Sequence, residues 1–157
     1  MEYNILINKE EITHRIDLLT HYHADKEKRN DLNADVGETS CEDEEILETF
    51  LQKAINELIA SQTERLKNIS YKINNDYIEI RFIGSDERRS NILPILKQTI
   101  TDYLVNELMA QWLLIRYPAW GQSYIAMRND LYAQVKELFS CFCKRKIRRR
   151  PTNLAGI

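Results

Sequence analysis

Apolar residues recur at helical spacing in four stretches of the chain. We therefore predict four helices, over residues 9–23, about 43–67, about 90–117 and about 121–143. The second helix starts at a candidate capping box, formed by Ser40 with Asp43 or by Thr39 with Glu42. In the third helix, apolar residues cover more than half of the circumference, so we expect it to be the central helix.

Between the second and third helices the pattern changes to period two. Apolar residues alternate with polar ones in 69–73 and again in 76–83, on either side of Asn74 and Asn75. Both asparagines tolerate the positive φ of tight turns, which predicts a β-hairpin. A lone hairpin is marginally stable, so this one should lie on the helices or pair with a neighbouring chain. The predicted fold class is mainly α: a small bundle of about four helices with one inserted β-hairpin and a basic C-terminal arm.

The 157 residues provide enough material for one domain with an arm at either end. We divide the chain into an N-terminal helix with a polar, acidic loop (1–41), a helical core that includes the hairpin 69–83 (42–143), and a basic arm with a tail (144–157). The opening MEYNILINKEE has only a short apolar patch and no basic region before it, so no secretory signal is expected. No apolar run has the length of a membrane span.

Charge is distributed very unevenly along the chain. The net charge is −2, but 144–150 reads KRKIRRR, with six basic residues in seven positions; removing those six charges leaves −8 on the remainder. Residues 31–52 contain eight acidic residues and no lysine or arginine. An acidic body of this kind will not bind nucleic acid broadly, although the arm could. The arm has three interpretations: phosphate binding, a solubilising end, or folding onto an acidic or strand-edge surface of a partner.

Histidine spacing gives little support to a metal site. His21 and His23 are two residues apart, whereas ligands on one helical face lie three or four apart. His14 and His21, seven apart, could share a face. Solvent-facing imidazoles are the favoured interpretation, and no metal ligand is predicted.

The three cysteines are interpreted as free thiols in a reducing cytoplasm. Cys141 and Cys143 lack the second pair that a structural zinc site needs, so we assign them to the last apolar turn of the fourth helix. The basic residues that follow could lower the pKa of these thiols. Cys41 lies in the acidic stretch.

Catalytic motifs are not found either. The chain has no glycine-rich phosphate loop and no nucleophile elbow, and the acidic run does not fit the spacing of a calcium loop. We therefore predict a protein that is not an enzyme and uses no cofactor.

Four aromatic residues gather at the expected turn between the third and fourth helices: Trp112, Tyr117, Trp120 and Tyr124. Such clusters serve as core packing or as interface anchors. Core packing is favoured for Trp112, and the two interpretations of Trp120 are equally supported.

The order of elements carries a resemblance. The acidic helix CEDEEILETFLQKAINELIASQTERL precedes a β segment, a long helix with LVNELMAQWLLIRYP, and a further helix. Ala110, Gln111 and Trp112 match the A-x-W pattern of the central helix in head–tail connector (adaptor) proteins of tailed bacteriophages and prophages. The chain resembles these proteins over about 42–151, and RKIRRRP is similar to the ends of small structural proteins in Bacteroidetes prophage clusters. The first 41 residues depart from the short connector pattern.

The resemblance implies a structural virion component at the neck or upper tail, assembled in the host cytoplasm. It implies a ring of about a dozen copies that joins portal to tail, with DNA passing through the centre only as cargo and no membrane involved. Acidic residues would face the channel, where phosphates are repelled; the candidates are Asp31, Asp35, Glu38, Glu42 and Asp43. Docking onto portal and tail or neck proteins would fall to the C-terminal residues Lys144, Arg145, Lys146, Arg148, Arg149, Arg150, Pro151, Leu154 and Ile157.

The alternative function is a nucleic-acid-binding accessory or regulatory protein that uses the basic arm. Its binding would weaken sharply with salt. The sequence disfavours it, because no helix-turn-helix can be argued and most of the surface is acidic.

Overall fold

A computed structural model describes residues 1–30, 41–85 and 87–143. Over these residues the fold is mainly α, with four α-helices and a small three-stranded antiparallel sheet, as the sequence predicts. The α-helices are α1 (Lys9–Asn30), α2 (Cys41–Ala60), α3 (Leu93–Arg116) and α4 (Pro118–Ser140). The strands are β1 (Glu2–Asn8), β2 (Lys67–Ile73) and β3 (Tyr77–Ile83), and a short 3-10 helix, η1 (Glu87–Ile92), precedes α3.

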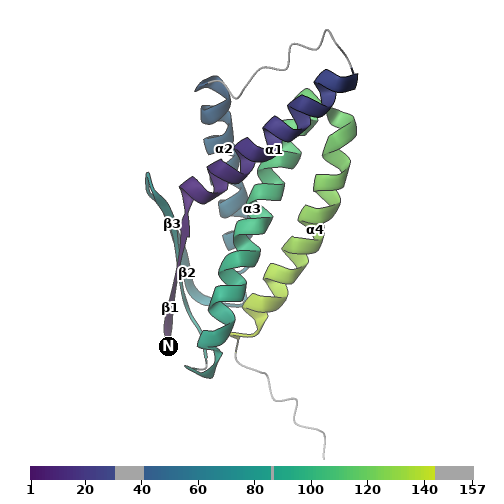
Figure 1. The fold of residues 1–157 in the computed structure, drawn as a ribbon. Helices are drawn as coiled ribbons and strands as arrows, with labels where there is room; N and C mark the ends of the chain where they lie inside the picture. The colour runs from purple at the N-terminus through teal and green to yellow at the C-terminus, as the bar shows by residue number, and fades with distance from the viewer. Residues whose placement is uncertain (31–40, 86, 144–157) are drawn as a thin grey trace, which may run out of the picture.

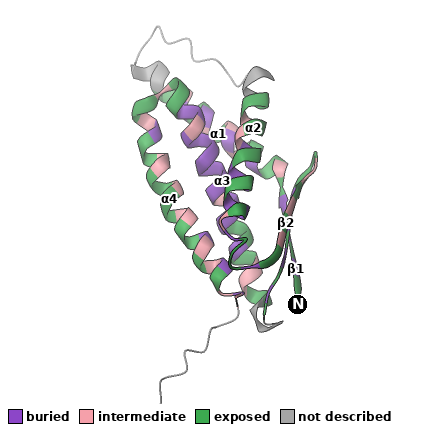
Figure 2. Ribbon diagram, turned by 180° about the vertical axis from the view of Figure 1, so that it is seen from behind, coloured by how far each residue is buried: buried purple, intermediate pink, exposed green. Residues whose placement is uncertain are grey.

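Helix α3 lies in the middle of the molecule, with α1, α2 and α4 around it (Figure 1). From Thr99 to Leu113 nearly every residue of α3 is buried, so its backbone stands out as a continuous buried column in Figure 2. A helix that is apolar on all sides has to be covered on all sides. The expectation of a central third helix is confirmed.

The chain turns between α3 and α4 within a single residue. Tyr117 is both the C-cap of α3 and the N-cap of α4, and its φ of −142° takes it out of the helical region. Pro118 cannot continue a helix but suits the first turn of the next one. Helices α3 and α4 therefore run antiparallel and in close contact along their length (Figure 1).

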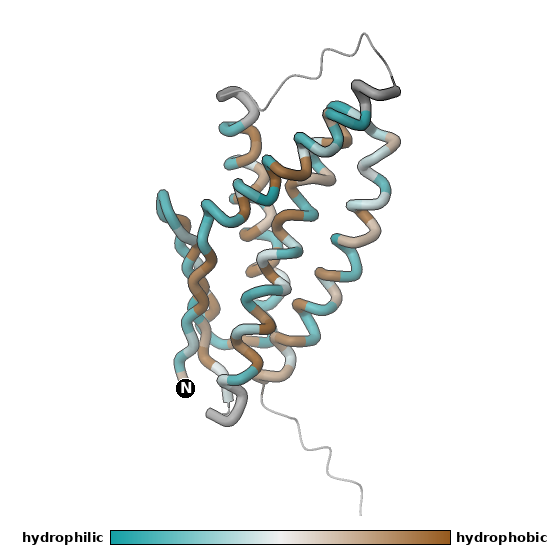
Figure 3. The backbone as a smooth tube through the Cα atoms, viewed as in Figure 1, coloured by the Kyte–Doolittle hydropathy of each residue, from teal (hydrophilic) through white to brown (hydrophobic). Residues whose placement is uncertain are grey.

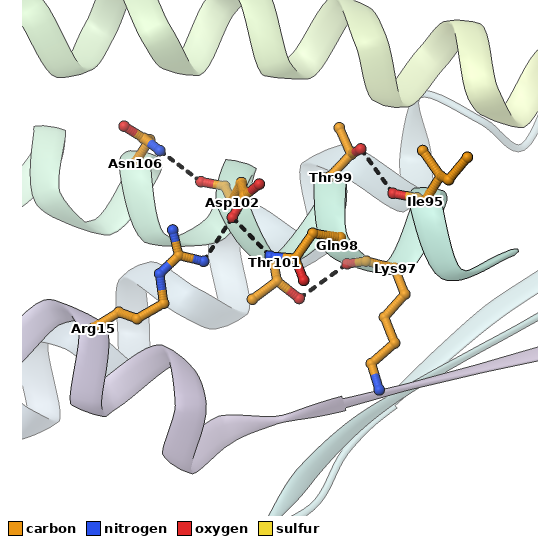
Figure 4. Close-up of polar contacts among 8 residues, drawn as sticks. All are labelled: Arg15, Ile95, Lys97, Gln98, Thr99, Thr101, Asp102 and Asn106. Carbon is orange, nitrogen blue, oxygen red and sulfur yellow. Dashed lines mark hydrogen bonds and ion pairs between the residues drawn. The ribbon is translucent and has the colours of Figure 1, made fainter. Parts of the chain in front are cut away.

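Helix α1 crosses α3 and is joined to it by an ion pair. The Arg15 guanidinium Nη1 lies 2.6 Å from Asp102 Oδ1, which also accepts from the side-chain amide of Gln98 at 3.1 Å (Figure 4). Both charged groups are about one-third exposed, so the pair positions the two helices more than it stabilises them.

The sheet contains a strand that the sequence analysis did not predict. Its order is β1-β3-β2, so the N-terminal strand β1 pairs with the far strand of the hairpin. Tyr3, Ile5 and Ile7 on β1 are buried at 2%, 3% and 0% exposure, in strict alternation with exposed residues. The hairpin is therefore stabilised by a third strand, β1, that comes from the same chain.

One core holds the sheet against the helices. The buried side chains of β1 and β3 belong to the same hydrophobic cluster as those of α2, α3 and the end of α4. Along the strands, hydrophobic positions alternate with hydrophilic ones (Figure 3). Beyond the end of α4, Phe142 is 1% exposed and packs its ring against Tyr3 and Phe82, at centroid distances of 4.8 and 5.1 Å. The sheet and the four helices thus share one hydrophobic interior.

Several element boundaries differ from the prediction, most of all at the ends of three helices. Helix α1 runs seven residues further, to Asn30, because helix formers such as Ala24 and Lys26 follow its last apolar residues. Helix α2 ends at Ala60 instead of 67, since Ser61 and Thr63 bond their hydroxyls back to the helix carbonyls and turn the chain. Helix α4 ends at Ser140, so the CFC stretch forms a hydrogen-bonded turn after the helix rather than its last turn.

Candidate protein-interaction surfaces

The four aromatic residues predicted at the α3–α4 turn do not form one site. Trp112 is 3% exposed and belongs to the core, whereas Tyr117, Trp120 and Tyr124 are half-buried against it. Trp112 and Tyr117 are 6.4 Å apart between ring centroids. Trp120 and Tyr124 instead enclose a residue of α1.

That residue is His23, which joins the ends of α1 and α4. Its Nε2 lies 2.8 Å from the Tyr124 hydroxyl oxygen, and its ring meets Trp120 edge-on at a centroid distance of 4.7 Å. Lys26 Nζ lies 4.9 Å from the centroid of the Trp120 ring on the solvent side. Contacts between these side chains of α1 and α4 thus hold the two helices together at this end of the bundle.

Burial, and secondarily the nearby Lys26 charge, lowers the pKa of His23 below its ordinary value. Burial also raises the pKa of the Tyr124 hydroxyl. Both side chains are therefore neutral at neutral pH. Their hydrogen bond links α1 to α4.

The interpretation of the histidines as solvent-facing is wrong for His23, which is 7% exposed. His14 and His21 are exposed, and His21 Nδ1 contacts the carbonyl oxygen of Asp17 at 2.8 Å within its own helix. Within the described ranges, no three histidine, cysteine, aspartate or glutamate side chains gather closely enough to hold a metal ion.

The Cys143 thiol lies at the turn that follows α4, beside Arg65. Burial raises the pKa of Cys143, with only a smaller opposing effect from Arg65. The Cys143 Sγ donates to the carbonyl oxygens of Arg65 and Phe139 at 3.5 and 3.7 Å. Cys141 and Cys143 are half-buried and are not joined to each other by a disulfide.

A second buried polar group lies between α3 and α4. Glu107, 7% exposed, pairs with Arg128 at 3.0 Å and accepts from the Gln111 amide at 3.1 Å. Burial, followed by the Glu107 charge, raises the pKa of the adjacent Tyr103 hydroxyl. These groups satisfy one another, so they form a closed structural network.

A groove of about 520 Å³ opens between α1, α2 and the tip of the hairpin. Its floor is apolar and its rim is acidic. The floor is formed by Ile12, Ile16, Leu47, Leu51 and Leu108, and the rim carries Glu10, Glu44, Glu48 and Asp76. Among the described lining residues the single lysine, Lys9, is already paired with Glu48 at 2.9 Å. The groove therefore suits a segment that is both basic and apolar.

The outer edge of β1 is a further surface, because β1 lies at one end of the sheet and no strand among the described residues pairs with it on that side. Leu6 is 48% exposed there, and a shallower groove separates it from Leu93 and Pro94 at the start of α3. Sequence reasoning missed this edge because it missed the strand, although the alternation of Tyr3, Ile5 and Ile7 was available as a signal.

The residues assigned by resemblance to docking and to a channel lie outside the described residues. This holds for all of 144–157 and for Asp31, Asp35 and Glu38, and no side-chain placement is described for Glu42 and Asp43.

Comparisons of the chain with protein-family models, with curated proteins and with solved structures found no match. Within the described part of the chain, no helix has both the length and the apolar character required to cross a bilayer. The described surfaces that expose apolar side chains are the groove between α1, α2 and the hairpin tip and the edge of β1.

Proposed function

We propose that this protein is a non-enzymatic structural component of a tailed-phage virion, a ring-forming head–tail connector that joins the portal to the tail. The body supplies the contacts between subunits, and the basic segment 144–157 docks onto portal, neck or tail proteins. The acidic residues of 31–43 face the channel through which DNA passes.

The observation that carries a protein-binding role is the groove between α1, α2 and the hairpin tip. Its acidic rim repels phosphates, so it is unsuited to nucleic acid. Its apolar floor and four carboxylates complement a segment such as KRKIRRRP, which combines basic residues with Ile147. The groove therefore supports a role in binding a basic and apolar segment of a portal, neck or tail protein.

The order of the elements is consistent with the same proposal. An acidic amphipathic helix, a β segment, a central helix and a further helix follow one another as α2, β2–β3, α3 and α4. This is the order on which the resemblance to connector proteins rests, and it supports the proposal at the level of architecture.

The test is assembly with a portal protein and tail proteins of the same source. Light scattering and negative-stain imaging should detect rings when the proteins are mixed. Glu44→Lys at the groove rim should reduce ring formation, whereas Glu64→Lys, an exposed charge reversal away from the groove, should not. A protein that stays monomeric with every partner overturns the proposal.

A mobility-shift assay separates this function from nucleic-acid binding. The full chain and the chain ending at Cys143 should bind duplex DNA with equally low affinity at physiological salt. If residues 144–157 alone confer tight binding that weakens steeply with salt, the nucleic-acid function is the correct one.

A further inference from the structure

The two edges of the sheet are protected to different degrees. Strand β2 carries Lys67 and Lys72, and its register shifts at a bulge next to Asn68, which has a positive φ of 54°. Lysines and bulges are the usual devices that keep an edge strand from pairing with another chain. Strand β1, EYNILIN, contains no lysine, proline or bulge, and pairs in regular register with β3. The β1 edge is therefore open to a further strand.

The backbone groups on this edge can be assigned from the bonds on the other side. Gly84 N–H donates to the carbonyl of Met1 at 2.9 Å, and Lys9 N–H donates to the carbonyl of Asp76 at 3.0 Å. The odd-numbered residues of β1 therefore direct their backbone N–H and C=O groups toward β3, because the direction of these groups alternates along a strand. Leu6 and its even-numbered neighbours consequently direct their backbone N–H groups outward.

The sequence of β1 is self-complementary about Leu6. Residues Asn4–Asn8 read N-I-L-I-N in both directions. When two such strands run antiparallel around a two-fold axis at Leu6, the two copies of Leu6 form a hydrogen-bonded pair. Asn4 of each copy then faces Asn8 of the other, and Ile5 faces Ile7 on the helical side. Within Asn4–Asn8, each residue therefore meets a residue of the same type.

Space for the second strand lies beside the edge. The groove between β1 and the start of α3 has a volume of about 400 Å³ and is lined by Asn4, Leu6, Leu93, Pro94 and Lys97. In Figure 4 the long side chain of Lys97 extends from α3 toward β1, where it can move aside.

We propose that two copies of this chain pair through their β1 edges, antiparallel about Leu6, to form a six-stranded sheet in a two-fold dimer. The partner is a second copy because the strand is complementary to itself. A two-fold contact closes on two copies and cannot build a ring, so this inference does not rest on the proposed function. It describes the protein before or apart from larger assembly.

Sedimentation analysis of the isolated full chain tests the dimer. At roughly 100 μM, a suitable range for an interface below about 1,200 Å², the chain of 18.6 kDa should sediment at twice its mass. Leu6→Lys should weaken dimerisation by roughly tenfold or more, because two like charges would face each other across the axis. Ile83→Lys is the matched control, since Ile83 is 42% exposed on the same sheet but lies in the central strand. Circular dichroism should show both variants folded.

Cross-linking locates the contact. In a background with Cys41→Ser, Cys141→Ser and Cys143→Ser, Leu6→Cys should form a disulfide-linked dimer under mild oxidation, because directly paired residues bring their Cα atoms within disulfide reach. Ile83→Cys should not. The proposal is overturned by a wild-type chain that remains monomeric at roughly 100 μM, by a dimer that Leu6→Lys leaves intact, or by equal cross-linking of both cysteine variants. If Leu6→Lys still forms rings with portal and tail proteins, the proposed function stands independently of this result.

Discussion

His23 Nε2 lies 2.8 Å from the hydroxyl oxygen of Tyr124, which joins α1 to α4 between residues that are 101 positions apart. His23 Nδ1 is buried without a hydrogen-bond partner among the described residues. The imidazole therefore depends on this one contact for its hydrogen bonding. Both the stability of this end of the bundle and its dependence on pH follow from that arrangement.

Replacing Tyr124 with Phe should lower the free energy of unfolding by about 1–2 kcal/mol, because the buried imidazole loses its hydrogen bond while the ring packing is kept. Tyr77→Phe, at a position 41% exposed on β3, serves as the control and should change it by less than about 0.5 kcal/mol. Urea denaturation of both variants checks this. Equal effects would mean that the His23–Tyr124 contact contributes nothing specific.

Acidification should destabilise the protein through His23. The pKa of His23 is lowered from 6.5 in the folded state, so the unfolded chain binds more protons in the window below 6.5. At pH values above 6.5 His23 is neutral in both states and the protein keeps its full stability. As the pH falls from 6.5 toward the folded pKa, the unfolded state gains protons first and the free energy of unfolding decreases. Between about pH 7.5 and about pH 5, His23→Gln should lose less stability than the wild type, while the exposed-site control His14→Gln should behave like the wild type. Parallel pH profiles for His23→Gln and wild type would contradict the assignment.

Phe142 should be the last residue that the core requires. Its ring is 1% exposed and meets two aromatic residues of the sheet, so Phe142→Ala should cost about 3–5 kcal/mol. Met127→Ala, at a position 54% exposed on α4, should stay within about 0.5 kcal/mol. Thermal unfolding should also show that a chain ending at Cys143 keeps its cooperative transition and one ending at Ser140 does not. A stable fold in the shorter chain would place the core boundary elsewhere.

Gly84 follows β3 at a point where no side chain fits. A Cβ there would lie 2.7 Å from Cε2 of Tyr3 and 3.2 Å from Cβ of Phe142, so Gly84→Ala should cost about 1–3 kcal/mol. Gly121→Ala provides the contrast. Its Cβ would lie 3.3 Å from two side-chain carbons of Leu114 and 3.5 Å from the Leu114 backbone nitrogen. The helix gains up to about 1 kcal/mol from alanine, so the net change should be small. Similar losses at both glycines, measured by denaturation, would contradict the packing at Gly84.

The helices and the hairpin could be predicted because their signals are local. The apolar recurrence of α3 extends over its whole length, and Asn74 and Asn75 mark the hairpin turn. The limits of α1 and α2 were less predictable. Lys26 extends α1 by helix propensity alone, and Ser61 ends α2 through a hydroxyl bond that a periodicity argument does not include.

Strand β1 and the burial of His23 depend on partners far away in the chain. Ile5 pairs with Ile80, and the alternation in EYNILIN gives no indication of which strand it will join. His23 lies among polar residues at the end of an apolar stripe, so its burial follows from Trp120 and Tyr124 on α4. Local patterns can propose such elements, but only the packed fold selects their neighbours.

The position of β1 in the sheet also has a consequence during synthesis. The pair Asn4–Glu79 links residues 75 positions apart, so the ribosome must add that length before β1 has a partner. At about 5–20 residues per second the delay is roughly 4–15 s. During this interval an apolar strand with an unprotected edge is exposed, and contacts of such long range also slow folding itself. The nascent β1 segment is therefore most vulnerable to misassociation before β3 has been synthesised, and a chaperone that binds short extended apolar segments would find a binding site at NILIN.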